Sequence, residues 1–148
     1  MSTRPSTILT GVSGEYFVAA ELSRRGYIAS ITLRNTAGVD VLASSADGSK
    51  QVAIQVKTTR GDYPSWLLGK KAETYFERNL FYVFVALGDG LPAFHVVPSK
   101  KVADTVQRGH AEWLKGTKPD GGPRKDTDMR SFTDEDGKYL GRWDLLRL

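Results

Sequence analysis

Three polar residues near the middle of the chain have the types and spacing that phosphodiester chemistry requires. Asp40 ends the tripeptide GVD, and Gln55 and Lys57 flank the valine of the tripeptide QVK. A carboxylate and an amide oxygen are hard ligands that hold Mg²⁺ in proteins. A lysine beside them can orient or deprotonate an attacking water, or stabilise developing negative charge. The three residues therefore indicate a metal-assisted hydrolytic site.

The pattern around Gln55 and Lys57 predicts a strand in which these two side chains share one face, because residues two apart in a strand point the same way. One face carries Val52, Ile54 and Val56, and the other carries Ala53, Gln55 and Lys57. A strand at the centre of an α/β sheet is normally apolar on both faces. Two polar side chains there indicate a site, and we expect Asp40, on the preceding strand, to lie beside them.

Glu15 is a further candidate within an expected helix. The helix is predicted to begin at Thr10 or Ser13, to run to about Arg25 and to stop at Gly26. At helical spacing, Glu15 shares a face with Val18, Ala19 and Leu22. A carboxylate on an inward face is costly unless it is paired or binds a metal. The alternative is a first-turn acid that the helix dipole favours.

The elements that must position these residues can be read from periodicity and turn residues. Strands are expected at 27–33, 39–44, 51–58, 80–87 and 93–97, turns at 34–38 and 46–49, and further helices at about 65–78 and 98–108. The first three strands are expected to form an antiparallel meander. The apolar run 80–87 predicts a strand buried on both faces at the centre of the sheet.

The composition changes along the chain, and this change predicts the domain organisation. We expect a leader at 1–10, a core at 11–112 and a C-terminal extension at 113–148. Residues 116–138 are poor in large apolar side chains and are expected to form a long, flexible loop. The last ten residues become apolar again, so we expect this tail to dock on the core.

The order of these features resembles the PD-(D/E)XK phosphodiesterase superfamily. Over roughly 11–97, the expected features come in this order: a helix with a glutamate, a strand, GVD, a strand with QVK, a helix and an apolar strand. This arrangement is similar to that of archaeal Holliday-junction resolvases and several prokaryotic restriction-type nucleases. The resemblance implies an α/β, restriction-endonuclease-like core with α-β-β-β-α-β order, in which helices flank a mixed central sheet.

The resemblance also implies an activity and assigns roles. It implies a metal-dependent endonuclease that hydrolyses DNA, with Mg²⁺ or Mn²⁺ as cofactor and a homodimer as a possible state. Asp40 and Gln55 match its metal ligands, and Lys57 and Glu15 match its other catalytic positions. Val39 replaces the proline of the motif, and Gln55 replaces an acidic residue. The neutral Gln55 leaves an alternative open, a catalytically inactive nucleic-acid-binding or protein-interaction module of the same fold.

Basic residues near the motif are candidates for contacts with nucleic acid. Arg60 follows the QVK strand, and Lys70 and Lys71 lie in the expected next helix. The alternative for each is an ordinary solvated surface position. The formal charge of +4 permits a polyanionic partner without requiring one. A third interpretation is an α/β domain whose polar strand residues are structural and which binds no nucleic acid.

Several classes of protein are excluded or disfavoured by what the sequence lacks. There is no cysteine, which excludes disulfides and thiolate metal sites and fits a cytoplasmic location. The sequence has no apolar run long enough to span a membrane, and it has no Walker, G-x-S-x-G or G-x-G-x-x-G motif. The two histidines have no partner at metal-ligand spacing, which disfavours a zinc site.

Overall fold

The structure is a computed structural model that describes residues 3–33 and 36–148. Its elements are α1 (Thr7–Arg24), β1 (Ile28–Ile31), β2 (Val41–Ser44), β3 (Gln51–Arg60), β4 (Ser65–Gly69), η1 (Lys70–Glu73), β5 (Leu80–Leu87), β6 (Ala93–Pro98), α2 (Ser99–Leu114), β7 (Met129–Thr133) and η2 (Trp143–Leu146). Residues 1–2 of the expected leader and 34–35 of the expected turn lie outside the described residues.

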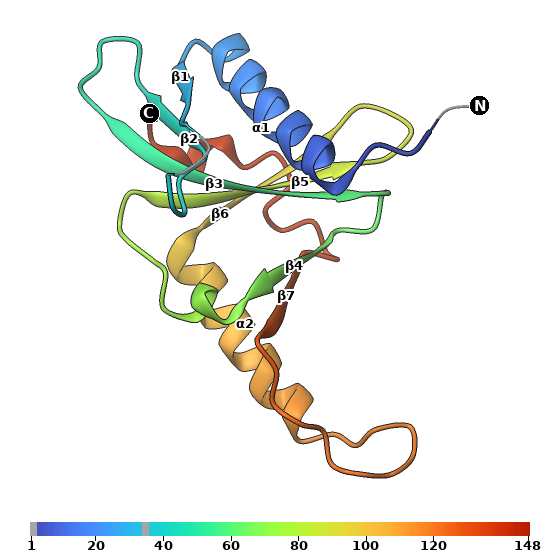
Figure 1. Ribbon diagram of the computed structural model, residues 1–148. Helices are drawn as coiled ribbons and strands as arrows, with labels where there is room; N and C mark the ends of the chain where they lie inside the picture. Colours follow the sequence, from blue (N-terminus) through green and yellow to red (C-terminus); the bar gives the residue numbers. More distant parts are fainter. Residues whose placement is uncertain (1–2, 34–35) are drawn as a thin grey trace.

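A mixed five-stranded sheet forms the centre of the molecule. Its strand order is β1-β2-β3-β5-β6, in which β3 and β5 are parallel and the other neighbours are antiparallel. Figure 1 shows α1 on one side of this sheet and α2 with the β4–β7 pair on the other. A mixed sheet flanked by helices is the predicted fold class, which the structure confirms.

β5 divides the hydrophobic core into two layers because its side chains are buried on both faces of the sheet. Phe81, Val83 and Val85 pack with α1 and η2, whereas Tyr82 and Phe84 pack with β4, β7 and α2. The prediction of a central strand at 80–87 is therefore confirmed. Because both faces are covered, this strand fixes the positions of the two layers relative to each other.

β3 shows the predicted alternation of apolar and polar side chains. Val52, Ile54 and Val56 are buried in the layer under α1. Gln55 and Lys57 therefore face the opposite layer, and both are half-buried. Because β3 is paired along both edges, its register fixes which side chains face each layer.

The helix expected at 65–78 is wrong. This segment forms strand β4 and then the short 3-10 helix η1. Trp66 and Leu68 point into the core at the two-residue spacing of a strand, and the Trp66 indole N–H donates to the Val85 carbonyl at 2.9 Å. Gly69, a poor helix former, lies where the strand ends. Pairing with β7, distant in the sequence, decides the outcome here.

The expectation that 116–138 is entirely loop is also wrong. Met129–Thr133 forms β7, which pairs antiparallel with β4. Phe132 stacks on Phe84 with ring centroids 4.6 Å apart, and the buried Arg130 forms an ion pair with Glu73 at 2.6 Å. These long-range contacts supply the burial that the composition of the segment does not suggest. The division of the chain at 112 and 113 stays a prediction, and α2 continues to Leu114.

The C-terminal tail packs against the body of the protein, and a buried polar pair lies at its start. His95 Nδ1 and Asp134 Oδ2 are 2.6 Å apart, and both side chains are buried. Asp134 also accepts hydrogen bonds from the backbone N–H groups of Lys138 and Tyr139. These bonds fix the turn that leads to Trp143, which is buried in the layer under α1.

The helix ends differ from the predicted ends by a few residues. α1 begins at Thr7 because the Ser6 hydroxyl caps it by accepting from the Leu9 N–H at 3.2 Å, so the predicted caps Thr10 and Ser13 lie inside the helix. α2 extends beyond the predicted end at 108. No helix among the described residues combines the length and the apolar character needed to cross a membrane.

α1 lies unusually close to β3 at Gly14. A Cβ atom at this position would overlap the Thr58 hydroxyl and lie 3.0 Å from the Thr58 Cβ. The Thr58 Oγ1 is buried and has no hydrogen-bond partner among the described residues. The close approach therefore costs an unsatisfied hydroxyl, and it brings the next residue of the helix, Glu15, toward the sheet.

We expect the Gly14→Ala variant to be destabilised by about 1–3 kcal/mol, because the added methyl group overpacks the contact with Thr58 and a β-branched side chain cannot easily move aside. Gly11→Ala is the matched control on the same helix, since a Cβ there meets nothing within 4 Å. It should be stabilised by roughly 0.5–1 kcal/mol. Urea unfolding of both variants measures the difference, and equal stabilities would contradict the close packing.

Candidate active site

Asp40 lies where the hydrogen-bond ladder between β2 and β3 ends. Val41 pairs with Ile54, so the same antiparallel register places Asp40 opposite Gln55. The Asp40 N–H donates to the Ile54 carbonyl at 2.9 Å, and its Oδ2 accepts from the Val56 N–H at 2.7 Å. The carboxylate thus accepts the N–H that lies between Gln55 and Lys57, in place of a strand carbonyl. The structure brings these three predicted residues together.

The segment from Gly38 to Asp40 is held by hydrogen bonds from two other parts of the chain. Thr32 donates through its N–H to the Asp40 carbonyl at 3.0 Å and through its hydroxyl to the Val39 carbonyl at 2.6 Å. The Tyr75 hydroxyl donates to the Gly38 carbonyl at 2.7 Å. Gly38 has a φ of 74°, and a Cβ there would overlap the Tyr75 ring. Only glycine satisfies both constraints without strain.

A groove on the α1 side of Asp40 contains two carboxylates. Glu15 and Asp40 both line this cavity of about 450 Å³, which lies between α1 and the connection from β1 to β2. Among the described residues that line it, the others include apolar side chains and threonines and none is basic. We call it the carboxylate groove. Its two carboxylates suit a cation, and the predicted Glu15 lies in it.

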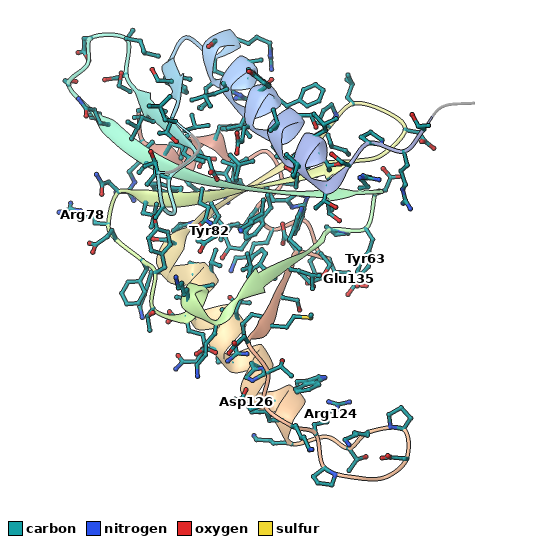
Figure 2. All side chains as sticks on the ribbon, in the orientation of Figure 1. Tyr63, Arg78, Tyr82, Arg124, Asp126 and Glu135 are labelled. Atoms are coloured by element: carbon teal, nitrogen blue, oxygen red, sulfur yellow. The ribbon has the colours of Figure 1, made fainter. Side chains whose placement is uncertain are left out.

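A second cavity of about 450 Å³ lies on the opposite face of the sheet. Its lining includes Gln55, Lys57, Leu68, Lys71, Tyr75 and Tyr82. We call it the lysine pocket, because its lining among the described residues includes two lysines and no acidic residue. Figure 2 shows the labelled Tyr82 beneath the central sheet, on the side of α2 and β4. Asp40 therefore lies between a groove suited to cations and a pocket suited to anions.

The electrostatics of the site follow from this placement. Burial raises the pKa of the Asp40 carboxyl, and the Val56 N–H and the Lys57 ammonium oppose the increase. Burial also raises the pKa of Tyr75, and the nearby Asp40 charge adds to the effect. Burial, and to a lesser extent Tyr75, raises the pKa of Tyr82 to about 12, so its hydroxyl is a donor at neutral pH.

The donor set around Asp40 fits a hard cation. Asp40 and Glu15 offer carboxylate oxygens to the same groove, and Gln55, opposite Asp40, offers an amide oxygen. Oxygen ligands of this kind suit Mg²⁺ or Mn²⁺. Within residues 3–33 and 36–148, no three side chains of His, Cys, Asp or Glu gather as a metal-binding group. A site here would therefore depend on the Gln55 amide or on ligands from outside the chain.

The other predicted residues take different positions. Lys71 lies in η1 and lines the lysine pocket, whereas Lys70 is exposed and its N–H donates to the Asp128 carbonyl at 2.8 Å. Arg60 lies at the C-terminal end of β3, where its guanidinium donates to the Thr10 hydroxyl at 2.8 Å and to the Pro5 carbonyl. Arg60 thus anchors the first turn of α1, and its predicted contact with nucleic acid stays a prediction.

Sequence reasoning missed two tyrosines that line the lysine pocket. Tyr82 belongs to an apolar run and was interpreted only as part of a buried strand. Its position depends on the parallel register in which Gln55 pairs with Tyr82. Tyr75 was assigned to a helix that does not form. The available signal is the alternation of side chains along 80–87. Once the parallel register with β3 is known, this alternation places the Tyr82 hydroxyl on the same face of the sheet as Gln55.

The titration of Tyr82 should make the stability of the protein depend on alkaline pH. Between the ordinary tyrosine pKa of 10.0 and about 12, the folded state keeps a proton that the unfolded state loses. The free energy of unfolding therefore decreases as pH rises through this window, and the contribution is complete below 10.0. Urea unfolding of Tyr82→Phe should show a shallower decrease. Tyr63→Phe, at an exposed position, is the control, and identical slopes for both variants would exclude this assignment.

Tyr75 should hold the Asp40 carboxylate against β3. Loss of its hydrogen bond in Tyr75→Phe should loosen the segment from Gly38 to Asp40, so that the Val56 amide exchanges hydrogen roughly fivefold faster. The Ala53 amide, which donates to the Asn79 carbonyl, is the internal control on the same strand. Amide exchange followed by NMR measures both, and unchanged exchange at Val56 would show that Tyr75 does not position Asp40.

Comparison with known proteins gives a match only at the level of structure. No family model matches the sequence, and no curated protein sequence matches it. The bacterial homing endonuclease I-Ssp6803I superposes with a TM-score of 0.56 and 15% identity over 97% of this chain and 94% of that chain. The Holliday junction resolvase Hjc from the archaeon Archaeoglobus fulgidus has a TM-score of 0.48 and 16% identity over 84% of both chains. The likeness to the homing endonuclease confirms the α/β, restriction-endonuclease-like fold expected from the sequence.

Proposed function

We propose that the protein is a metal-dependent endonuclease that hydrolyses phosphodiester bonds in DNA. The observation that carries the proposal is the position of Asp40 between the carboxylate groove and the lysine pocket, opposite Gln55 and hydrogen-bonded to the N–H of Val56, the residue before Lys57. Hydrolysis of a phosphodiester needs a cation and an anion site side by side. This junction offers both within one short stretch of β2 and β3.

The charge of each side chain determines its proposed role. Asp40, Glu15 and Gln55 would hold Mg²⁺ or Mn²⁺, which supplies charge stabilisation on the phosphate and a more acidic bound water. Lys57 holds the phosphate from the other side and stabilises negative charge as water attacks phosphorus and a P–O ester bond breaks. The half-buried Asp40 also benefits, since a bound cation offsets the cost of burying its charge.

A Lys57→Ala variant should lose activity by about two to four orders of magnitude, because it removes charge from the transition state or the group that positions water. Asp40→Ala should lose activity by a comparable factor. The assay incubates each protein with linear, nicked, branched and single-stranded DNA in Mg²⁺ or Mn²⁺. Lys101→Ala is the matched control, since this lysine is exposed on α2. Full activity in a folded Lys57→Ala protein would refute the assignment.

A second candidate function is binding of nucleic acid without cleavage, which the neutral Gln55 favours. A Gln55→Glu substitution distinguishes the two, because it supplies the acidic ligand that the resemblance leads one to expect. We expect Mn²⁺ to bind roughly tenfold more tightly to this variant, as affinity follows the charge of the ligands. Calorimetry measures the affinity. A wild-type protein that binds no metal and cuts no DNA, beside an active Gln55→Glu variant, would establish the binding role.

A further inference from the structure

Three donor side chains converge on the lysine pocket without an acceptor from the protein. Lys57, Lys71 and Tyr82 all line the cavity, beside Gln55. Within residues 3–33 and 36–148, no hydrogen bond or ion pair joins the polar end of any of them to another residue. Tyr82 is only 2% exposed, yet it lines the cavity. Donors that face a cavity and have no acceptor in the protein are suited to a ligand that carries acceptor atoms.

The donor groups lie at different depths in the pocket, and their depths determine which end of a ligand each can contact. Lys71 is exposed in η1 and lies at the mouth, whereas the buried Tyr82 lies at the floor. The floor also includes the buried, apolar Leu68 and Ala72, with the half-buried Tyr75 beside them. A ligand that fits therefore carries its negative charge at one end and a flat or apolar group with an acceptor at the other.

The charges around the pocket favour an anion on this side of the site only. In the part of the chain that the structure describes, no acidic side chain lines the lysine pocket, and Asp40 and Glu15 line the groove on the other side of the sheet. A cavity of about 450 Å³ lies within the range of small-ligand sites. A nucleotide has the required chemistry, with a phosphate at one end and a planar base with acceptor nitrogen and oxygen atoms at the other.

We propose that the lysine pocket binds one unstacked nucleotide, with its phosphate at Lys57 and Lys71 and its base on the floor formed by Leu68 and Tyr82. This deepens the proposed function and rests on it for the identity of the polymer. A paired and stacked base cannot enter such a pocket, so the base must be extruded, which is costly in a perfect duplex and costs little where the base is already unpaired. The preferred substrate then has an unpaired nucleotide beside the cleaved bond.

The experiment measures DNA binding by fluorescence anisotropy in EDTA, where metal-dependent cleavage is suppressed. Three duplexes are compared, one perfectly paired, one with a single unpaired adenine and one with an unpaired abasic nucleotide at the same place. We expect the unpaired adenine to bind about tenfold more tightly than the abasic duplex, because only the base can accept a hydrogen bond from the Tyr82 hydroxyl and pack on Leu68. Equal affinity for these two duplexes would overturn the proposal.

Two substitutions separate the base from the phosphate. Tyr82→Phe keeps the ring that packs on Phe84 and should reduce the preference for adenine over the abasic nucleotide. Lys71→Gln should weaken binding of both by a similar factor, since it acts on phosphate. Lys101→Gln is the control for loss of a surface charge. A preference for adenine that Tyr82→Phe leaves intact would place the base elsewhere and overturn the proposal.

Insertion and cleavage are tested separately. With 2-aminopurine as the unpaired base, its fluorescence should change on binding to the wild-type protein and much less on binding to Tyr82→Phe. Cleavage of the same duplexes in Mn²⁺ is measured in parallel. Selective binding without cleavage supports the pocket and counts against the nuclease. Cleavage that is equal for all three duplexes, together with unselective binding, supports the nuclease and overturns the pocket.

Discussion

β3 pairs antiparallel with β2 over Gln51–Ile54 and parallel with β5 over Ala53–Arg60, and these two registers together fix the orientation of its side chains. A shift of one residue would put Gln55 and Lys57 into the layer under α1 and move Val56 out of it. The burial of Val56 and Ile54 therefore also determines the position of the polar residues. The candidate site depends on a packing constraint that has no chemical role of its own.

This packing constraint acts on the candidate site at the end of the β2–β3 ladder. β2 begins at Val41, one residue after Asp40, so the Val56 N–H would lack a partner if the Asp40 carboxylate did not accept from it. A buried N–H without a partner is costly, and a buried carboxylate without a partner is costly too. The hydrogen bond between the Val56 N–H and the Asp40 carboxylate therefore offsets much of the free-energy cost of burying each group. The raised pKa of Asp40 shows that the cost of burial is not fully offset by this bond and Lys57.

The second layer shows how distant segments complete a site. β4 and β7 are joined through Trp66, Phe132 and Arg130, whose side chains are buried against β5 or paired with η1. This pairing places η1 below β3, and η1 carries Lys71 toward the lysine pocket. Tyr75 follows η1 and reaches back to the Gly38 carbonyl. The segment after β3 is thus both a wall of the pocket and a support for the segment that carries Asp40.

The resemblance to the PD-(D/E)XK superfamily implied the fold class. Local pattern in the sequence was sufficient for α1, the meander of β1 to β3 and the central β5, because these elements follow from periodicity and turn residues. It also predicted that Asp40, Gln55 and Lys57 would lie together, since a hairpin brings neighbouring strands side by side. It failed for 65–78 and 116–138, where β4 and β7 stabilise each other across more than sixty residues. The partners of Arg60 and the place of Tyr82 in the lysine pocket were likewise decided by tertiary structure. The local sequence of these segments is compatible with more than one conformation. Contacts between distant segments determine which one is adopted, and no local pattern encodes those contacts.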